Sequence, residues 1–566
     1  MPSSFQLSSS SPTVQLHLPD GRVLTGPRGT KVGESLQTVK DDFDAPIVAA
    51  IVNNELHELT YPIEMESQVH PITMDTADGA RIYRRSLVFL LEMAFAALFP
   101  KGKLTIDHSI SSGGYFCQVA GRGQLSQSEL DALAVHMRGL IQENLPFERR
   151  EVPLEEAIGY FKKLKFDDKV RLLAHRQKPY LTLYSLKDRM DYLHGYMVPS
   201  TGYLKWFELS LVSGGFTLHF PRRHAPTALE PMGDYPKLLA AFRQYGDWLT
   251  RLGIDSVGAL DDAIQDSRTD EIVLVSEAMH ERHLTQIAGQ VAERESSIVL
   301  IAGPSSSGKT TFSRRLSVQL LANGISPYPL ELDNYFVQRD QTPLGRDGQP
   351  DYEALEALDL PLLAEHLAGL VRGDKVYLPR YNFKLGLREA GDVVQLHKGQ
   401  ALILEGIHGL NPRLVPGPLA GRAFKVYVSA LTQVNLDRHN RVSTTDTRLI
   451  RRIVRDARER GYSAAQTISR WEAVRRGEKR HIFPYQENAD VMFNSALVYE
   501  LSALKPLAEP LLRQVPYGTL EYIEAKRLLA FLEWFLPIDA SLIPANSIVR
   551  EFMGGSSLKG FKVWKR

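Results

Sequence analysis

The sequence contains a single cysteine, Cys117, among 566 residues. A disulfide within the chain is therefore excluded, and a zinc site built from cysteines is not expected. Long apolar runs are also missing. The most apolar stretch, residues 87–99, is interrupted by Glu92, whereas a membrane-spanning helix needs about 20 apolar residues. We therefore expect a buried helix in this stretch, and no membrane partner for the protein.

An excess of charge of one sign is missing as well. The formal net charge is +1, from 67 Lys and Arg against 66 Asp and Glu. This balance gives no general attraction to nucleic acid or membranes, although it leaves room for a local basic patch. Residues 1–13 are rich in serine and lack the basic start and apolar core of a secretory signal. We expect a disordered lead-in there and a cytoplasmic protein.

What the sequence does contain is a phosphate-binding pattern at residues 298–316, "IVLIAGPSSSGKTTFSRRL". The β-branched run at residues 298–302 predicts a buried strand, and the spacing of Phe312, Leu316 and Leu320 predicts a helix. Between them lies G-x-x-x-x-G-K-[ST], the P-loop pattern. We predict that ATP binds to the residues of this loop, which are Gly303, Pro304, Ser305, Ser306, Ser307, Gly308, Lys309, Thr310 and Thr311.

The spacing of this loop has a physical basis. Glycines let the backbone turn tightly and direct its N–H groups inward, where they and the helix N-terminus bind phosphate. Lys309 can reach the β- and γ-phosphates, and the Thr310 hydroxyl is placed to bind Mg²⁺. A chance glycine-rich turn is the alternative, but a strand before the loop and a helix after it disfavour that alternative. The sequence thus predicts ATP and Mg²⁺ as cofactors.

Further acidic and aromatic residues follow the P-loop. Asp333 ends a predicted strand, where a carboxylate of a parallel sheet faces the ligand crevice. Asp351 lies near the start of a predicted helix, and Tyr381 and Phe383 end the strand-like run "KVYLPRYNF". Glu405 ends the apolar strand "QALILE", where an acid can support Mg²⁺. The alternative for Glu405 is an acid at the surface end of a strand.

A basic helix is predicted over residues 446–461, "DTRLIRRIVRDARERG". Arg448, Arg452 and Arg455 share one face of this helix. Because the arginine fork can bind two phosphate oxygens, we favour a lid that closes over the triphosphate. A solvated basic helix and a nucleic-acid-binding surface are the alternatives.

Residues 296–500 as a whole resemble the uridine kinase/phosphoribulokinase family, through Lys309, "LDNYF", "PRYNF", "LEGIHGLN", "RLIRRIVRD" and "ENADVMFNSAL". The resemblance implies that Asp333 is the catalytic base beside Lys309, with Thr310 and Glu405 at the metal. It further implies ATP contacts from Arg451 and Arg455, and acceptor contacts from Asp351, Tyr381, Phe383 and Arg448. Two residues depart from the family pattern. Asn382 replaces the usual Asp, and Gly386 stands in place of a His.

The N-terminal half resembles a different enzyme. Residues 14–75, with hairpins around "PDGR" and Asn53-Asn54, resemble the β-grasp TGS domain that opens threonyl-tRNA synthetases. Residues 76–225 resemble the editing domain of those synthetases. The four positions of the editing pocket read Arg85, Phe89, Leu193 and Met197, which offer no metal ligand set and no general base. The resemblance implies an inactive editing-like domain and leaves room for RNA contact through the N-terminal domains.

Two segments carry no predicted chemistry. Residues 226–295 form a helical connector that includes His280 and His283. Histidines three apart on a helix can bind metal, but we favour an exposed polar face. Residues 501–566 form a mixed helical C-terminal extension.

The sequence therefore predicts a multidomain protein of α/β and α+β class. A β-grasp domain and an α+β editing-like domain precede a P-loop kinase with a parallel sheet flanked by helices. We expect a homo-oligomeric Mg-ATP-dependent kinase that phosphorylates a hydroxyl of a small-molecule nucleoside. A kinase of a sugar phosphate such as ribulose phosphate, and an RNA- or ribosome-associated P-loop regulator, are the alternatives. A tRNA-editing hydrolase is disfavoured by the four replaced pocket residues.

Overall fold

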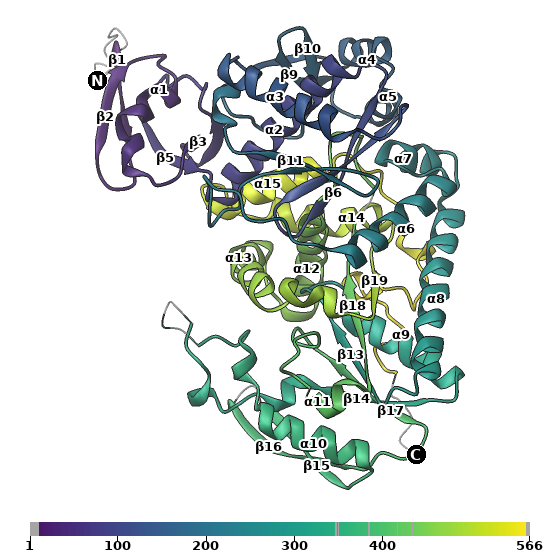
Figure 1. Ribbon diagram of the computed structural model, residues 1–566. Helices are drawn as coiled ribbons and strands as arrows, with labels where there is room; N and C mark the ends of the chain where they lie inside the picture. The colour runs from purple at the N-terminus through teal and green to yellow at the C-terminus, as the bar shows by residue number, and fades with distance from the viewer. Residues whose placement is uncertain are drawn as a thin grey trace, which may run out of the picture.

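The computed structural model describes residues 11–345, 348, 350–382, 385–415, 417–432 and 434–561. Figure 1 shows two units side by side at the top of the view and a third unit below them. The N-terminal β unit lies beside an α+β unit, and the kinase-like unit lies below both. The predicted lead-in at residues 1–13 falls mostly outside the described residues, which begin at Ser11.

The N-terminal unit is a mixed five-stranded sheet in the order β2-β1-β5-β3-β4. Its strands are β1 (Thr13–His17), β2 (Val23–Pro27), β3 (Ile47–Val52), β4 (Glu55–Glu58) and β5 (Ser67–Thr73), and α1 (Val32–Leu36) covers it. Both predicted hairpins are confirmed. Asn53 and Asn54 have φ values of 49° and 69°, the left-handed conformation that a two-residue hairpin turn requires.

The second unit packs two antiparallel sheets around a long buried helix. Helix α2 (Ala77–Leu98) contains the apolar stretch that begins at Leu87, and its Leu87, Phe89 and Leu90 are fully buried, as predicted. The four-stranded sheet has the order β11-β12-β7-β6 and the smaller sheet β10-β9-β8. Within the described residues, no helix has the length and apolar character needed to cross a membrane. The other elements are β6 (Lys103–Ile110), β7 (Gly114–Ala120), α3 (Gln127–Gln142), β8 (Glu148–Pro153), α4 (Leu154–Lys163), α5 (Asp167–Ala174), β9 (Tyr180–Leu186), β10 (Arg189–Asp191), β11 (Glu208–Val212) and β12 (Gly215–His219).

The predicted helical connector consists of α6 (Pro236–Leu252), α7 (Val257–Gln265) and α8 (Thr269–Glu293). The expectation of an exposed histidine face on α8 is wrong for His280, which is buried. Its ring lies 5.0 Å from the ring of Phe493, a residue of the kinase-like sheet. The reason is that α8 turns this face toward the sheet, so the ring fills apolar space and is not solvated.

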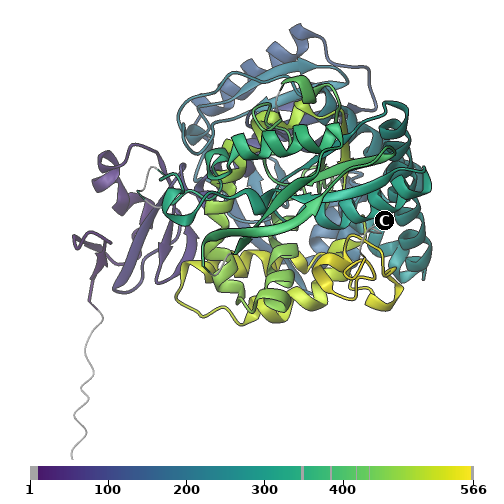
Figure 2. The same cartoon turned by 90° about the horizontal axis from the view of Figure 1, so that it is seen from below.

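The kinase-like unit has a five-stranded sheet in the order β14-β17-β13-β18-β19, and every pair in it is parallel. Figure 2 shows this unit from below, with the teal helices of the connector and the yellow C-terminal extension beside it. Strand β13 occupies the middle, as the apolar run at residues 298–302 predicts. The strands are β13 (Ile298–Ala302), β14 (Ser326–Glu331), β17 (Gln400–Glu405), β18 (Ala423–Ser429) and β19 (Val491–Asn494).

The helices of this unit are α9 (Lys309–Ala322), α10 (Leu360–Arg372), α11 (Gly417–Ala420), α12 (Thr444–Arg460) and α13 (Ala464–His481). The basic helix is confirmed as α12. The helix predicted to begin near Asp351 instead begins at Leu360. The Asp359 side chain accepts from the backbone N–H of Leu362 and Pro361 occupies the first turn, and both features favour a helix start there.

Two segments lie outside this sheet. The run "KVYLPRYNF" pairs as an antiparallel ribbon of β15 (Val376–Asn382) with β16 (Leu387–Val394). The C-terminal extension forms α14 (Glu500–Arg513), α15 (Leu520–Leu532) and the short α16 (Arg550–Met553). The extension packs back onto the kinase-like unit, where Ile548 is fully buried.

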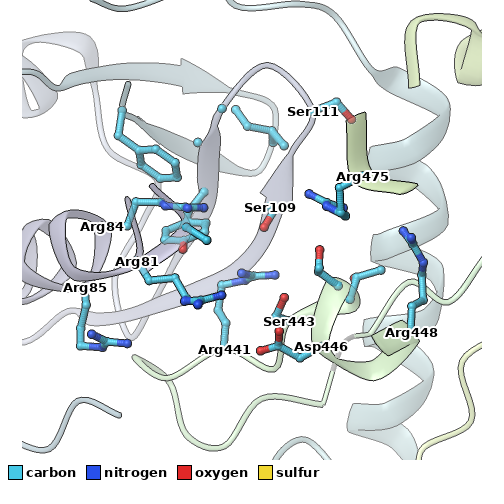
Figure 3. Close-up of a pocket in the computed structure, with 18 of the residues that line it drawn as sticks. Arg81, Arg84, Arg85, Ser109, Ser111, Arg441, Ser443, Asp446, Arg448 and Arg475 are labelled. Atoms are coloured by element: carbon cyan, nitrogen blue, oxygen red, sulfur yellow. The ribbon is translucent and has the colours of Figure 1, made fainter. Parts of the chain in front are cut away.

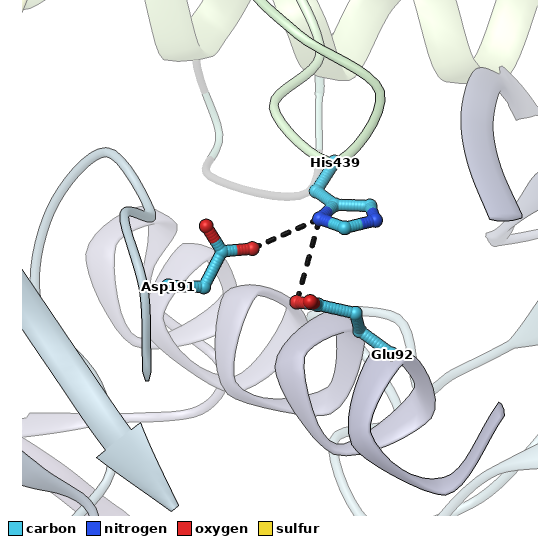
Figure 4. Close-up of side chains that lie close together, drawn as sticks. All are labelled: Glu92, Asp191 and His439. Carbon is cyan, nitrogen blue, oxygen red and sulfur yellow. Dashed lines mark hydrogen bonds and ion pairs between the residues drawn. The ribbon is translucent and has the colours of Figure 1, made fainter. Parts of the chain in front are cut away.

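A buried ionic network joins the second unit to the kinase-like unit (Figure 4). His439, in the loop after β18, contacts Asp191 with 2.9 Å between Nδ1 and Oδ2, and contacts Glu92 with 3.4 Å between Nδ1 and Oε2. The Lys169 ammonium lies 2.8 Å from Asp191 and 3.1 Å from Asp437. These groups have the types of metal ligands, but a lysine cation already neutralises Asp191. We therefore interpret the cluster as an interdomain ion network.

The pKa directions in this network agree with that interpretation. Burial opposes the charge of Lys169, but the Asp191 and Asp437 carboxylates outweigh burial and raise its pKa. Burial also opposes ionisation of Asp191, and Lys169 followed by His439 outweighs it and lowers the Asp191 pKa. For Glu92, burial and then the Asp191 charge raise the pKa well above its usual value. Burial and the neighbouring Asp191 charge thus favour the protonated form of Glu92.

We expect the substitution Lys169→Met to lower the free energy of unfolding by about 3–5 kcal/mol, because removing one partner leaves buried carboxylates uncompensated. Urea unfolding followed by tryptophan fluorescence measures this effect. Lys163→Met is the matched control, since Lys163 is exposed on α4 and its loss should change stability by less than about 0.5 kcal/mol. Equal stability of the two variants would contradict a structural role for the network.

Candidate active site

The P-loop takes the geometry that its glycines predict. A Cβ at Gly303 would lie 1.9 Å from the Val428 carbonyl oxygen, so only glycine lets the loop approach β18 this closely. Gly308 precedes α9 with a φ of 84°, which is a left-handed conformation that favours glycine. Ser306 also adopts a positive φ, of 58°. The loop is thus wrapped tightly around the N-terminus of α9, as phosphate binding requires.

The side chains of this loop suit a phosphate and a hard cation. Thr310 donates its hydroxyl to Glu405 with 2.8 Å between Oγ1 and Oε1, and hydroxyl and carboxylate oxygens are the ligands that Mg²⁺ prefers. The hydroxyls of Ser306 and Ser307 are buried and have no hydrogen-bond partner within the described residues. Lys309 donates to the Pro304 carbonyl at 3.2 Å. The residues present therefore fit ATP and Mg²⁺.

Asp333 lies at the same edge of the sheet as Glu405. Strand β14 ends at Glu331, two residues earlier than predicted, and Asp333 lies in the 3-10 turn that follows. Asp333 remains open to solvent, yet partial burial and then the Glu331 carboxylate raise its pKa, while the Lys309 charge lowers it. The Asp333 charge in turn helps to raise the pKa of Glu405. Lys309, Asp333 and Glu405 are thus close enough to shift one another's pKa.

The predicted acceptor residues are only partly brought together. The backbone N–H of Tyr381 donates to Asn334 at 3.1 Å, and its ring lies 5.7 Å from Phe336, so Tyr381 is next to the Asp333 turn. Asp351 instead forms an ion pair with Arg480 at the end of α13, at 3.0 Å. Phe383 lies outside the described residues. The acceptor role of these residues stays a prediction.

The basic helix α12 reaches the P-loop through two of its predicted arginines and one additional arginine. Arg448 donates to the Ser305 carbonyl at 3.0 Å, and Arg452 donates to the Ser305 hydroxyl at 2.7 Å. Arg451 is fully buried, pairs with Glu500 and donates to the Ser306 carbonyl. Arg451 therefore anchors the P-loop to the buried Glu500, and this fixed position does not fit a movable lid residue.

Arg455 has the weakest support among the predicted ATP contacts. It pairs with the adjacent Asp456, at 2.9 Å between Nη2 and Oδ1. No contact between Arg455 and the P-loop is found among the described residues. Arg452, which the family resemblance did not single out, is the better candidate for a phosphate contact. It reaches the loop because it lies one helical turn after Arg448 on the same face.

Two carboxylates at the loop have no counterpart among the predicted residues. Glu478 of α13 accepts from the Ser305 backbone N–H at 3.0 Å and pairs with Arg448. Glu551 of the C-terminal extension accepts from the Thr311 N–H at 3.2 Å and from the Thr311 hydroxyl at 2.8 Å. Both carboxylates lie where the P-loop presents donors for phosphate. No local sequence signal marks either residue.

The neighbouring Ile548 fixes the position of Glu551. A Cβ at Gly308 would lie 2.6 Å from the Ile548 side chain, so the extension packs directly on the P-loop. A carboxylate at the N-terminus of α9 is favoured by the helix dipole. The same position would repel an incoming phosphate, because two negative charges then compete for the same donors.

We expect Glu551→Gln to tighten ATP binding by about 5-fold or more, the low end of typical coupling between competing groups. Titration calorimetry with a non-hydrolysable ATP analogue measures the change. Glu459→Gln is the control, since Glu459 is exposed and pairs with Arg458. If the affinity for ATP is unchanged and the turnover is lower, Glu551 assists catalysis instead. That result would refute the expected competition between Glu551 and the phosphates of ATP.

The four predicted positions of the editing-like pocket do converge. Phe89, Leu193 and Met197 are buried in one hydrophobic core. Arg85 donates to the Tyr196 carbonyl, and a Cβ at Gly195 would lie 2.7 Å from the Arg85 guanidinium. Phe89, Leu193 and Met197 therefore fill these positions with apolar side chains, and the Arg85 guanidinium lies next to them.

We expect the purified protein to bind no stoichiometric zinc and to leave mischarged tRNA intact, since Arg85, Phe89, Leu193 and Met197 supply neither ligands nor an acid–base pair. Plasma emission spectrometry of the metal content and a deacylation assay with seryl-tRNA measure these properties. One zinc per chain, or hydrolysis above the rate of the uncatalysed reaction, would overturn this expectation.

A parallel sheet with a P-loop after its central strand, an acid at the end of the neighbouring strand and a second acid in the turn after the next strand are features of P-loop phosphotransferases. The comparison with known families agrees. Residues 298–502 match the Phosphoribulokinase / Uridine kinase family. This match covers the whole sheet from β13 to β19. This part of the chain is thus similar to the P-loop kinases of that family.

The N-terminal part is homologous to threonyl-tRNA synthetases. Threonine–tRNA ligase 2 of Bacillus subtilis is 29% identical over 206 residues, which are 36% of this chain and 32% of that protein. The threonine–tRNA ligase of Acidithiobacillus ferrooxidans is 35% identical over 171 residues, or 30% of this chain and 26% of that protein. The chain therefore spans at most about a third of the length of these curated relatives.

Two solved structures are similar to part of the chain. A possible uridine kinase from Bacillus stearothermophilus is 18% identical, covers 37% of this chain and 99% of its own, and has a TM-score of 0.25. The D-glycerate 3-kinase from Cryptococcus neoformans is 18% identical, covers 38% of this chain and 90% of its own, and has a TM-score of 0.27.

Proposed function

We propose that this protein is a Mg-ATP-dependent kinase that transfers the γ-phosphoryl group to a hydroxyl of a nucleoside. The observation that carries the proposal is the meeting of Lys309, the Thr310–Glu405 pair and Asp333 at one edge of the parallel sheet. A phosphate-binding lysine, a metal-binding pair and a free carboxylate are the parts that phosphoryl transfer to an alcohol needs. A P-loop that serves only as a switch has no use for Asp333.

In the proposed phosphoryl transfer, each of these residues has a separate role. The backbone N–H groups of the P-loop and the Lys309 ammonium would hold and neutralise the β- and γ-phosphates of ATP. Thr310 and Glu405 would hold Mg²⁺, which supplies charge neutralisation at the transferring phosphate when it is bound. Asp333 would accept the proton of the acceptor hydroxyl as the oxygen attacks phosphorus. Arg448 and Arg452 support the loop at Ser305 and add positive charge beside it.

The nature of the acceptor rests on the surroundings of Asp333. Tyr381 and Phe336 place aromatic rings beside the Asp333 turn, and flat apolar faces suit a nucleobase or the face of a sugar. Gly386 stands where the resembled family has a histidine, so one hydrogen-bonding partner for the base is lost. A site that lacks a polar partner discriminates less among substrates. We therefore propose relaxed base preference, or a preference for a nucleoside other than uridine.

Side-by-side kinetics with uridine, cytidine, adenosine, guanosine and ribulose 5-phosphate test the proposal, with ADP release as the readout. We expect measurable kcat/KM for at least two nucleosides, within about 100-fold of one another. Strict selectivity for uridine would refute the relaxed preference while leaving the kinase intact. Activity on the sugar phosphate alone would refute the nucleoside acceptor, and no ATP turnover with any alcohol would refute the kinase.

A further inference from the structure

A cavity of about 570 Å³ lies between the editing-like unit and the kinase-like unit. Its walls come from α2 and the β6–β7 hairpin on one side and from α12, α13 and the loop before α12 on the other. Figure 3 shows arginine side chains approaching it from both sides. No residue of the P-loop from Gly303 to Thr311 lines it. Arg448 lines the cavity and also contacts Ser305 of the P-loop, so the cavity adjoins the candidate active site but does not include the phosphate-binding loop.

The lining of this cavity is strongly basic. Ten Arg or Lys residues line it, against four Asp or Glu. Some of the cations are neutralised. Arg81 pairs with Glu524 at 2.8 Å, and Arg527 pairs with Asp446 at 2.8 Å. Arg222 and Arg448 pair with carboxylates just outside the lining, those of Glu230 and Glu478. Even with these two acids included, the cations outnumber the carboxylates.

Four of the cations have no carboxylate partner in the described part of the chain. Arg84 donates to the Ala80 carbonyl and lies over Phe220, and Arg441 donates to the Asp107 carbonyl and lies over Tyr115. Arg85 donates to the Tyr196 carbonyl. The Lys479 side chain makes no hydrogen bond or ion pair with any described residue. These side chains keep guanidinium and ammonium donors free to bind a ligand.

The titration of Lys479 reflects this excess of positive charge. Burial, followed by the neighbouring Arg475, Arg223 and Arg222, lowers the pKa of Lys479 to about 8. Burial also lowers the pKa of Arg85 to about 10. Such repulsion between partly buried cations is costly, and a bound anion would relieve it.

We propose that this interdomain cavity binds a small phosphate-bearing molecule, held by Arg84, Arg441 and Lys479 from its two walls. Guanidinium forks match phosphate oxygens in pairs, and the hydroxyls of Ser109, Ser111 and Ser443 line the same space. The volume falls in the range of small-ligand pockets, about 300–1,000 Å³. The rings of Tyr115 and Phe220 add flat apolar surface, so a nucleotide-sized ligand suits the cavity.

A small ligand is favoured over a nucleic acid for two reasons. The cations are gathered within one cavity between two units, and the chain as a whole has a net charge of only +1. Binding to the backbone of a nucleic acid depends on a broad basic surface that tracks many phosphates. The site also exists only because the two units are joined, since Arg84 and Arg441 come from different units.

Titration calorimetry of the full-length protein with inorganic pyrophosphate tests the proposal. We expect a dissociation constant below about 1 mM for the unsubstituted protein. Lys479→Gln and Arg441→Gln should each weaken binding by about tenfold or more, as expected for loss of a charge-assisted hydrogen bond. Arg476→Gln is the matched control, because Arg476 is exposed, neighbours Arg475 on α13 and does not line the cavity.

Further variants and ligands distinguish binding of a small ligand in the cavity from binding at the P-loop and from binding of a nucleic acid. Lys309→Ala should leave pyrophosphate binding at the cavity unchanged. If Lys309→Ala abolishes binding while the cavity variants retain it, the P-loop is the binding site and the proposal is overturned. Tighter binding of a ten-nucleotide single-stranded RNA than of pyrophosphate, weakened by the same cavity variants, would assign the surface to nucleic acid and overturn the small ligand. Because Arg441 spans the two units, its variant can fail to fold, and Lys479→Gln then decides the outcome.

Discussion

The substitution Lys309→Ala is expected to lower ATP-dependent phosphoryl transfer by at least about 10²–10³-fold, the loss typical of removing one group that stabilises charge in the transition state. Lys309 is a half-buried residue of the P-loop. Burial lowers its pKa, while the Glu405, Glu551 and Glu478 carboxylates act in the opposite direction. Its charge therefore acts in a site of low dielectric, where the interaction with a phosphate is strong. Turnover measured by ADP release gives the effect.

The control for this variant is Arg314→Ala, on the next turn of the same helix α9. Arg314 is not part of the P-loop, so we expect turnover within about twofold of the unsubstituted protein. A circular dichroism spectrum of each variant establishes that the fold is retained. Near-normal turnover of a folded Lys309→Ala protein would rule out the proposed mechanism.

The substitution Asp333→Asn is expected to lower kcat by about 10²–10⁴-fold, the contribution of a general base, with the affinity for ATP almost unchanged. The amide keeps the shape of the carboxylate but cannot accept the proton of the acceptor hydroxyl. The raised pKa of Asp333 supports this role, because a stronger base than an ordinary aspartate sits beside the lysine that binds phosphate. Steady-state kinetics and a separate ATP titration distinguish the two effects.

Asp340→Asn serves as the matched control, since Asp340 is an exposed aspartate a short distance along the same segment. If Asp333→Asn weakens ATP binding as much as it lowers turnover, Asp333 serves the metal and another group is the base. The pH profile adds a second readout. Because the Asp333 pKa is raised, activity limited by this base should be lost as pH falls below that pKa, and the variant should lose that dependence.

The P-loop could be predicted because everything that specifies it is local. The glycines, the lysine and the threonine lie within eight consecutive residues, and the strand and helix around them have clear apolar spacing. The same holds for β17, whose apolar run places Glu405 at the carboxyl end of a buried strand. The structure places Glu405 in a hydrogen bond with Thr310, and their role at a metal stays a prediction.

Helix boundaries and exposed helix faces are harder to predict from the sequence than the P-loop is. The helix expected near Asp351 begins at Leu360, because the cap at Asp359 and Pro361 provide a stronger start signal than the apolar spacing that precedes them. The polar sequence around His280 suggested an exposed face, but α8 packs that face on the kinase-like sheet. Such packing depends on residues about 200 positions away, such as Phe493.

The sequence by itself determined the phosphate-binding loop, the buried strands beside it and the absence of ligand chemistry at the four editing-like positions. Only the tertiary structure decided which charges meet. Glu478 and Glu551 reach the P-loop from 173 and 240 residues away, and the basic cavity draws Arg84 and Arg441 from separate units. The physical reason is that carboxylate and guanidinium groups interact across space, independently of sequence spacing, so no local pattern records which of them the fold brings together.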